Sequence, residues 1–107
     1  RQITYVNVMR NMSVSCDCEG CLAEPVVTPN VGILASTDIL ALDQACVDAC
    51  LAATPMPGSQ LYDEMHKPDF HDHHDHFKNS NPETEWKSCL EHAEKIGIGT
   101  REYELIK

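Results

Sequence analysis

The pattern of hydrophobic and polar residues predicts two extended segments in the first third of the chain. Between residues 3 and 14, β-branched and aromatic residues are frequent and alternate in part with polar ones, which is typical of a strand. The run Met9-Arg10-Asn11-Met12 interrupts this alternation, and we expect a bulge or a break there. The short apolar run at residues 31–35 is typical of a buried strand.

An amphipathic helix is expected directly after the second strand. Ser36, Thr37 and Asp38 supply the side-chain oxygens of an N-cap. The helix should run from about Asp38 to Ala53 and stop before the proline-rich residues 54–58. Six residues at helical spacing share its apolar face: Ile39, Leu42, Cys46, Ala49, Cys50 and Ala53. A buried strand that leads into such a helix is the pattern of an α/β layered domain.

A second main helix is predicted near the end of the chain, from about Pro82 to Ile96. Asn81 is a suitable N-cap before a proline at the first helical position, and Gly97 is a suitable C-terminal cap. The apolar stripe of this helix consists of Trp86, Cys89, Leu90, Ala93 and Ile96.

Three smaller features complete the predicted fold. We expect a short helix at residues 59–67 with Leu61 and Met65 inward, an exposed histidine-rich loop at residues 69–81, and a short strand at residues 103–106. The fold class is therefore α/β, a small layered domain with a few short strands flanked by the two main helices. A length of 107 residues suits one domain that spans residues 1–107.

The charge of the chain limits the classes of partner. The sequence has 17 acidic and 8 basic residues, a formal net charge of -9. Nucleic acids and anionic membranes attract basic surfaces, so neither is expected as a partner. No apolar stretch in the sequence approaches membrane-spanning length. Metal cations or a basic protein would suit this field better.

The start of the sequence indicates a piece of a longer protein. The chain begins with Arg1 rather than Met and opens directly in a strand-like run, so we expect a C-terminal fragment whose N-terminal region is missing. An exposed first strand would favour a homodimer through its edge.

Three cysteines lie close together in the run Cys16-Asp17-Cys18-Glu19-Gly20-Cys21, and thiolates at this spacing point into one small volume. The predicted occupant is an iron–sulfur cluster or a zinc ion. Both need four ligands, so a fourth must come from elsewhere; the candidates are Cys46, Cys50, Cys89, His92 or a residue of the missing region.

Other interpretations of the six cysteines remain open. In a secreted protein they could form three disulfides, whereas in a reduced, intracellular protein they would comprise a metal site and buried thiols. We favour the reduced alternative. Cys46, Cys50 and Cys89 all fall on apolar helical stripes, where a free cysteine behaves as a small buried hydrophobe. A catalytic pair of Cys89 with His92 is only weakly indicated.

The second candidate metal site is the histidine tract of the 69–81 loop. His71, His73, His74 and His76 alternate with two aspartates, a composition that binds Zn(II), Ni(II) or Cu(II). The simpler interpretation is a solvated loop that takes up metal from a buffer without a native role.

Several stretches resemble the family called domain of unknown function 362. They are residues 5–9 leading to Cys16-Asp17-Cys18, the run 31–38, and residues 41–45 and 92–99. Members of that family often carry a ferredoxin-like module with two four-cysteine motifs for [4Fe–4S] clusters, and this sequence has no such module. The resemblance implies an iron–sulfur context and a cytoplasmic location. Only Cys16 and Cys18 match the family's cysteine pair, so Cys21, Cys46, Cys50 and the histidine tract look like additions of this chain, which argues against one site for all six cysteines.

The leading hypothesis is a metal- or iron–sulfur-associated domain of a ferredoxin-linked protein, in which the cysteine run serves electron transfer or structure. Its partner would be the missing N-terminal region or a ferredoxin-type module. One alternative is part of an enzyme active site completed by that region. Another is a structural domain held by disulfides.

Overall fold

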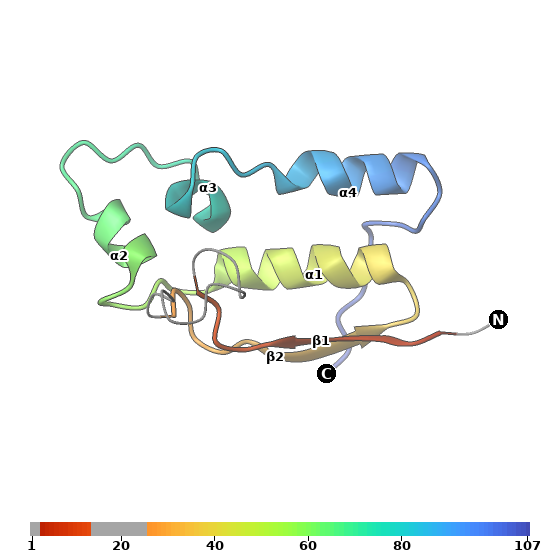
Figure 1. Cartoon of the computed structure of the whole chain (residues 1–107). Coiled ribbons are helices and arrows are strands. Elements are labelled where there is room, and N and C mark those ends of the chain that lie inside the picture. Colours follow the sequence, from red (N-terminus) through yellow and green to blue (C-terminus); the bar gives the residue numbers. More distant parts are fainter. Residues whose placement is uncertain (1–2, 14–25) are drawn as a thin grey trace.

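The computed structural model describes residues 3–13 and 26–107. The elements follow in the order β1 (Tyr5–Met9), β2 (Gly32–Ser36), α1 (Ile39–Ala52), α2 (Gln60–Met65), α3 (His76–Ser80) and α4 (Trp86–Lys95). Figure 1 shows three layers: the β1–β2 sheet, then α1, then α3 and α4 on the far side of α1. This arrangement confirms the predicted small α/β domain.

The two strands pair in antiparallel fashion, with Val6 opposite Ala35 and Val8 opposite Ile33. Because side chains alternate along a strand, Tyr5, Asn7 and Met9 face α1 while Val6 and Val8 face outward. The prediction of a buried second strand was wrong, since α1 covers only one face and the Ile33 side chain is 70% exposed. β1 is shorter than predicted because the chain turns at Asn11, whose φ of 54 is left-handed.

The predicted first helix is confirmed as α1, and Asp38 begins it. Asp38 Oδ1 accepts hydrogen bonds from the amides of Leu40 (2.9 Å) and Ala41 (3.1 Å). The buried face is wider than predicted because α1 lies between the sheet and α4 (Figure 1). It consists of Leu40, Ala41, Leu42, Ala45, Cys46 and Cys50, whereas the predicted Ile39 is exposed.

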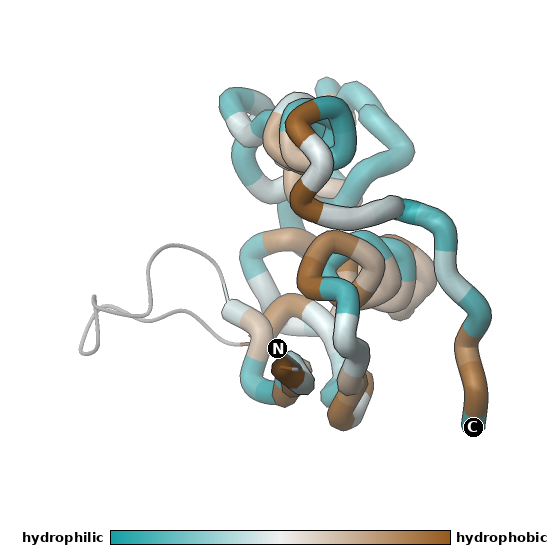
Figure 2. The backbone as a smooth tube through the Cα atoms, turned by 90° about the vertical axis from the view of Figure 1, so that its right-hand side faces the viewer, coloured by the Kyte–Doolittle hydropathy of each residue, from teal (hydrophilic) through white to brown (hydrophobic). Residues whose placement is uncertain are grey.

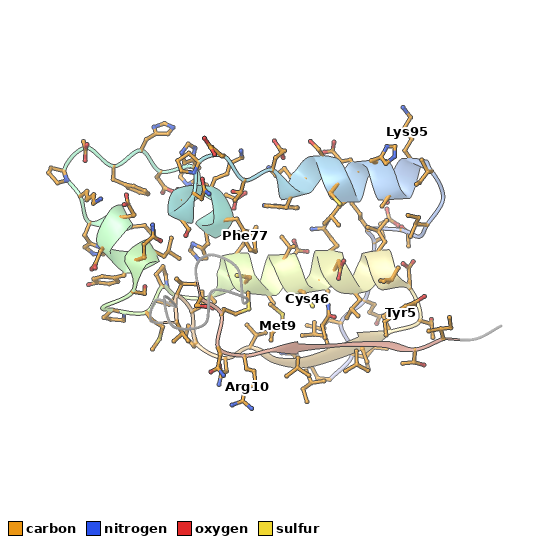
Figure 3. The ribbon with its side chains drawn as sticks, viewed as in Figure 1. Tyr5, Met9, Arg10, Cys46, Phe77 and Lys95 are labelled. Atoms are coloured by element: carbon orange, nitrogen blue, oxygen red, sulfur yellow. The ribbon has the colours of Figure 1, made fainter. Side chains whose placement is uncertain are left out.

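The main hydrophobic cluster lies between the sheet and α1. Met9 of β1 packs there with Leu42, Cys46 and Cys50 of α1. Figure 3 shows Tyr5 and Met9 pointing from β1 toward α1, and Phe77 pointing from α3 toward the same helix. The cluster therefore joins all three layers.

The histidine-rich segment was predicted to be an exposed loop over its whole length, and this prediction was wrong for its second half. α2, predicted at residues 59–67, leads through residues 66–75 into the short helix α3. Asp75 and Asn79 are buried, and Asp75 Oδ1 caps α3 by accepting from the amides of Phe77 (2.9 Å) and Lys78 (3.3 Å). The segment thus turns inward at its second half.

The last helix begins at Trp86 rather than at Pro82. The amide of Glu83 donates to Asn81 Oδ1 (3.0 Å) and that of Thr84 donates to the Asn81 carbonyl (3.0 Å), so a separate turn forms first. Leu90 is the buried residue of α4; the predicted inward Cys89 and Ile96 are exposed because α4 covers α1 with a narrow face. Gly97, with φ of 86, ends the helix as predicted.

The C-terminal tail, residues 98–107, forms no strand, contrary to the prediction. Side-chain bonds hold it instead: the Thr100 amide donates to Asp38 Oδ2 (3.0 Å) and the Tyr103 hydroxyl donates to Asp48 Oδ2 (2.6 Å). Figure 2 shows hydrophobic residues along both strands and again near the end of this tail. Across residues 3–13 and 26–107, none of the helices has the length and apolar character needed to cross a membrane.

Candidate functional site

A cavity of about 380 Å³ lies at the C-terminal end of α1, where all three layers meet. Cys50 of α1 and His76 of α3 line it. Met12 and Ser13, which follow β1, and Val27, which precedes β2, also line it. The remaining lining residues are Leu61, Phe77, Ser80, Asn81 and Thr84.

The described residues on either side of the segment 14–25 lie beside this cavity. The Val27 amide donates to the Met12 carbonyl at 2.6 Å, and the Met56 amide donates to the Val27 carbonyl at 2.8 Å. These bonds hold Met12 and Val27, which precede and follow the segment 14–25, next to each other and to the loop after α1. Cys16, Cys18 and Cys21 belong to that segment and lie outside the described residues.

Cys50 is a free thiol and is only 3% exposed. Burial raises the pKa of this thiol, and the negative charge of Asp75 raises it further. Without a cation the group is therefore a neutral thiol at neutral pH. A metal ion in the cavity would reverse this preference, because the thiolate is the form that ligates metals.

Asp75 is a buried carboxylate that connects α3 with α4. Besides capping α3, its Oδ2 accepts a hydrogen bond from the indole Nε1 of Trp86 at 2.8 Å. Sequence reasoning missed this residue, although an aspartate immediately before His76 is the signal of an N-cap.

His76 is half-buried, and its Nε2 lies 2.7 Å from the Ala53 carbonyl oxygen. A carbonyl only accepts, so Nε2 carries the proton in this bond and Nδ1 of the neutral ring keeps a lone pair. Metal-binding histidines commonly donate their second nitrogen to a backbone carbonyl in this way. The local geometry of His76 therefore suits a ligand or a hydrogen-bond acceptor at the cavity.

The other histidines of the tract point elsewhere. His71, His73 and His74 are exposed; the rings of His71 and His73 meet edge to face at 4.8 Å, and His74 Nδ1 lies 3.3 Å from Asp72 Oδ2. Hydrogen bonds, first from the His74 amide and then from Asn79, lower the pKa of Asp72. Within residues 3–13 and 26–107, no three His, Cys, Asp or Glu side chains gather closely enough to hold a metal ion.

The remaining cysteines lie apart from the cavity lining. Cys46 is buried in the core and accepts a hydrogen bond from Asn7 Nδ2 at 3.3 Å, as the core-packing interpretation predicts. Cys89 is exposed on α4, and so is His92, so the helical pair lies at the surface. Among the predicted candidates for a fourth ligand, Cys50 is the one at the cavity beside Met12 and Val27.

One protein-family model matches the chain, that of the domain of unknown function (DUF362), over residues 2–48. Residues 2–48 of the chain are thus similar to the DUF362 family. The match contains β1, β2, the cysteine run and most of α1, whereas Cys50 and α2 to α4 lie beyond it. No curated protein and no solved structure gives a significant match. The cavity therefore lies where the DUF362 segment meets the part of the chain outside the match.

Proposed function

We propose that this domain binds an iron–sulfur cluster or a zinc ion through Cys16, Cys18 and Cys21, with Cys50 as the fourth ligand. The observation that carries the proposal is the cavity at the end of α1. The residues that flank the cysteine segment, Ser13 and Val27, line this cavity together with Cys50.

The length of the chain supports this ligand set. Cys16 is the third residue after Ser13, and three residues span at most about 11 Å. Ser13 lines the cavity together with Cys50, so the Cys16 backbone can lie no more than this distance from a residue that borders the same volume. Cys46 faces the sheet and Cys89 faces solvent, so neither is placed to ligate a metal ion in this cavity.

The ligand chemistry decides what such a site would hold. Four thiolates suit either a structural zinc ion or a cubane cluster. His76, which lines the cavity and whose Nε2 donates to the Ala53 carbonyl, would suit hydrogen bonding near the site, or ligation of zinc through its other ring nitrogen. The exposed His71, His73 and His74 are a separate, weaker metal-binding group in this proposal.

The cellular role follows from the resemblance described for the cysteine pair. We infer a cytoplasmic protein linked to a ferredoxin-type module, in which the bound group transfers electrons or stabilises the fold. Among the cysteines that the structure describes, Cys46, Cys50 and Cys89 are free thiols, which supports a reduced protein over a disulfide-stapled one. An enzyme active site completed by a further region of a longer protein is the second candidate.

The test compares two single-cysteine variants. The chain is produced without a histidine tag, purified anaerobically, and assayed for iron, zinc and acid-labile sulfide. Cys50→Ser should lower the bound metal or weaken its affinity at least tenfold, because one of four ligands is lost. Cys89→Ser is the matched control, since it removes an exposed thiol of the same chain and should leave metal content unchanged.

Two further outcomes separate the alternatives. If Cys50→Ser and wild type retain the same metal while His71→Ala/His73→Ala/His74→Ala loses it, the metal belongs to the histidine tract and the proposal is wrong. If denatured wild-type protein shows no free thiols, the disulfide-stabilised alternative is correct instead.

A further inference from the structure

The four histidines of the tract divide into two pairs that line different cavities. His71 and His73 line a cavity of about 280 Å³, whereas His74 and His76 line a second cavity of about 270 Å³. The backbone turns between the pairs at His74, whose φ of 56 is left-handed. Histidines and aspartates alternate evenly in the sequence, so this division is a property of the fold.

A buried amide fixes the backbone between the two pairs. Asn79 of α3 is 5% exposed; its Oδ1 accepts from the His73 amide at 2.9 Å, and its Nδ2 donates to Asp72 Oδ1 at 3.1 Å. Asp72 Oδ1 also accepts from the His74 amide at 2.8 Å. These bonds attach residues 72–74 to α3, so the first pair of histidines does not sit on a freely moving loop.

The rings of His71 and His73 have the separation that a shared metal ion requires. Their centroids are 4.8 Å apart, and their planes meet at 82°. An ion about 2.0–2.1 Å from one nitrogen of each ring, with a bond angle between about 90° and 109°, would place the centroids about 4.5–5.2 Å apart. The observed separation lies in this range, so rotation of the rings about their side-chain bonds suffices to direct one nitrogen of each toward the ion.

The charged groups around this cavity leave room for a cation. Glu64 and Asp69 line it, and so do Lys67 and Lys78. Both ammonium groups already have partners: Lys67 Nζ lies 2.7 Å from Glu64 Oε1, and Lys78 Nζ donates to the Thr84 carbonyl at 2.8 Å. The net charge of -9 over the whole chain attracts cations rather than anions to such a site.

We propose that His71 and His73 together bind one zinc ion, or a similar divalent ion that prefers imidazole, with water in the remaining positions. Imidazole nitrogen suits Zn(II), Ni(II) and Cu(II), whereas Mg(II) and Ca(II) prefer oxygen. Two protein ligands agree with the finding that no closer group of three ligands exists within residues 3–13 and 26–107. A site with two protein ligands is exchangeable rather than structural, since structural zinc has four. The inference rests on the histidine part of the proposed function and not on the cysteine ligands.

Zinc titration of the full chain, followed by NMR of the isotope-labelled imidazole rings, tests this inference. The protein carries no histidine tag and is purified anaerobically. The ring signals of His71 and His73 should shift together as one ion binds, while those of the exposed His74 and His92 should stay in place.

Variants provide a second readout by isothermal titration calorimetry. His71→Ala/His73→Ala should weaken zinc binding at the tract by about tenfold or more, because both ligands are lost. His74→Ala/His92→Ala is the matched control, since it also removes two exposed histidines, and it should leave the affinity within about twofold. Circular dichroism confirms that each variant is folded.

Three results would overturn the inference. Equal weakening by both double variants would mean that zinc follows the number of histidines rather than a defined pair. Ring signals of His71 and His73 that do not respond to zinc would exclude the site. A response of these signals to inorganic phosphate but not to zinc would make the cavity an anion site. None of these results bears on the cysteine ligands, which the Cys50→Ser variant tests separately.

Discussion

Asp38 shows how a single side chain connects distant parts of this fold. One carboxylate oxygen caps α1 and the other accepts a hydrogen bond from the Thr100 amide in the tail. These backbone donors, first that of Thr100, lower the pKa of Asp38. The carboxylate is therefore ionised throughout the neutral range, and both contacts are strongest in that form.

Replacing Asp38 should destabilise the protein by an amount that depends on the new side chain. Asp38→Ala removes the cap and the tail contact and should lower the free energy of unfolding by about 1–2 kcal/mol. Asp38→Asn retains an oxygen acceptor for the cap and should lose less. Urea denaturation followed by circular dichroism measures both changes. Equal stability of Asp38→Ala and wild type would show that the cap contributes nothing.

Tyr103 is the second residue with a measurable signature. Its hydrogen bond to Asp48, together with partial burial and the negative charge of that carboxylate, raises the pKa of Tyr103 to about 12. A pKa that is higher in the folded state than its ordinary value of 10.0 stabilises the fold below pH 10. That stabilisation is lost as the pH rises from 10 to about 12, when the phenolate forms beside the carboxylate.

Ultraviolet titration of phenolate absorbance checks this value. The difference between wild type and Tyr103→Phe isolates one of the three tyrosines, and it should show ionisation centred near pH 12. Asp48→Asn should move that step toward pH 10 because it removes the carboxylate. An unshifted step in wild-type protein would mean that the tail does not contact α1 in solution.

At the scale of elements, the bond from Trp86 to Asp75 fixes α3 against the start of α4. Trp86→Phe keeps the aromatic bulk but removes the donor, which leaves one oxygen of a buried carboxylate without this partner. The expected loss of stability is about 1–3 kcal/mol. Thermal unfolding monitored by far-ultraviolet circular dichroism measures it, with Glu91→Ala as a surface control on α4. A change no larger than that of the control would contradict the role assigned to Asp75.

The elements also show which parts of the fold the sequence determines locally. β1, β2 and α1 were predicted because alternation, an N-cap aspartate and helical spacing are all local signals. α3, the late start of α4 and the irregular tail were not. They depend on contacts between residues far apart in the sequence, such as Asp75 with Trp86 and Tyr103 with Asp48.

The candidate site was likewise predictable from the sequence only in part. The cysteine run stands out in the sequence by its spacing, whereas the placement of Cys50 beside Met12, Ser13 and Val27 is seen only in the structure. The histidine tract looked uniform, whereas the structure separates an inward His76 from three exposed histidines because Asp75 begins a helix there. Local sequence does not distinguish these histidines.

At the scale of the whole molecule, the layers differ in whether the family match covers them. The sheet and most of α1 belong to the DUF362 match, while α3 and α4 cover the other side of α1 from outside it. The cavity with Cys50 lies at this junction. In the proposed function, the C-terminal part of the chain would both complete and shield a metal site on the matched segment.

The metal content of the wild-type chain tests this account most directly. Protein without a histidine tag, purified anaerobically, is analysed for iron, zinc and sulfide per chain. The account predicts about one zinc ion per chain, or about four irons with equal sulfide and absorbance near ~400 nm. Protein that is folded, has all its thiols free and contains neither metal would contradict it.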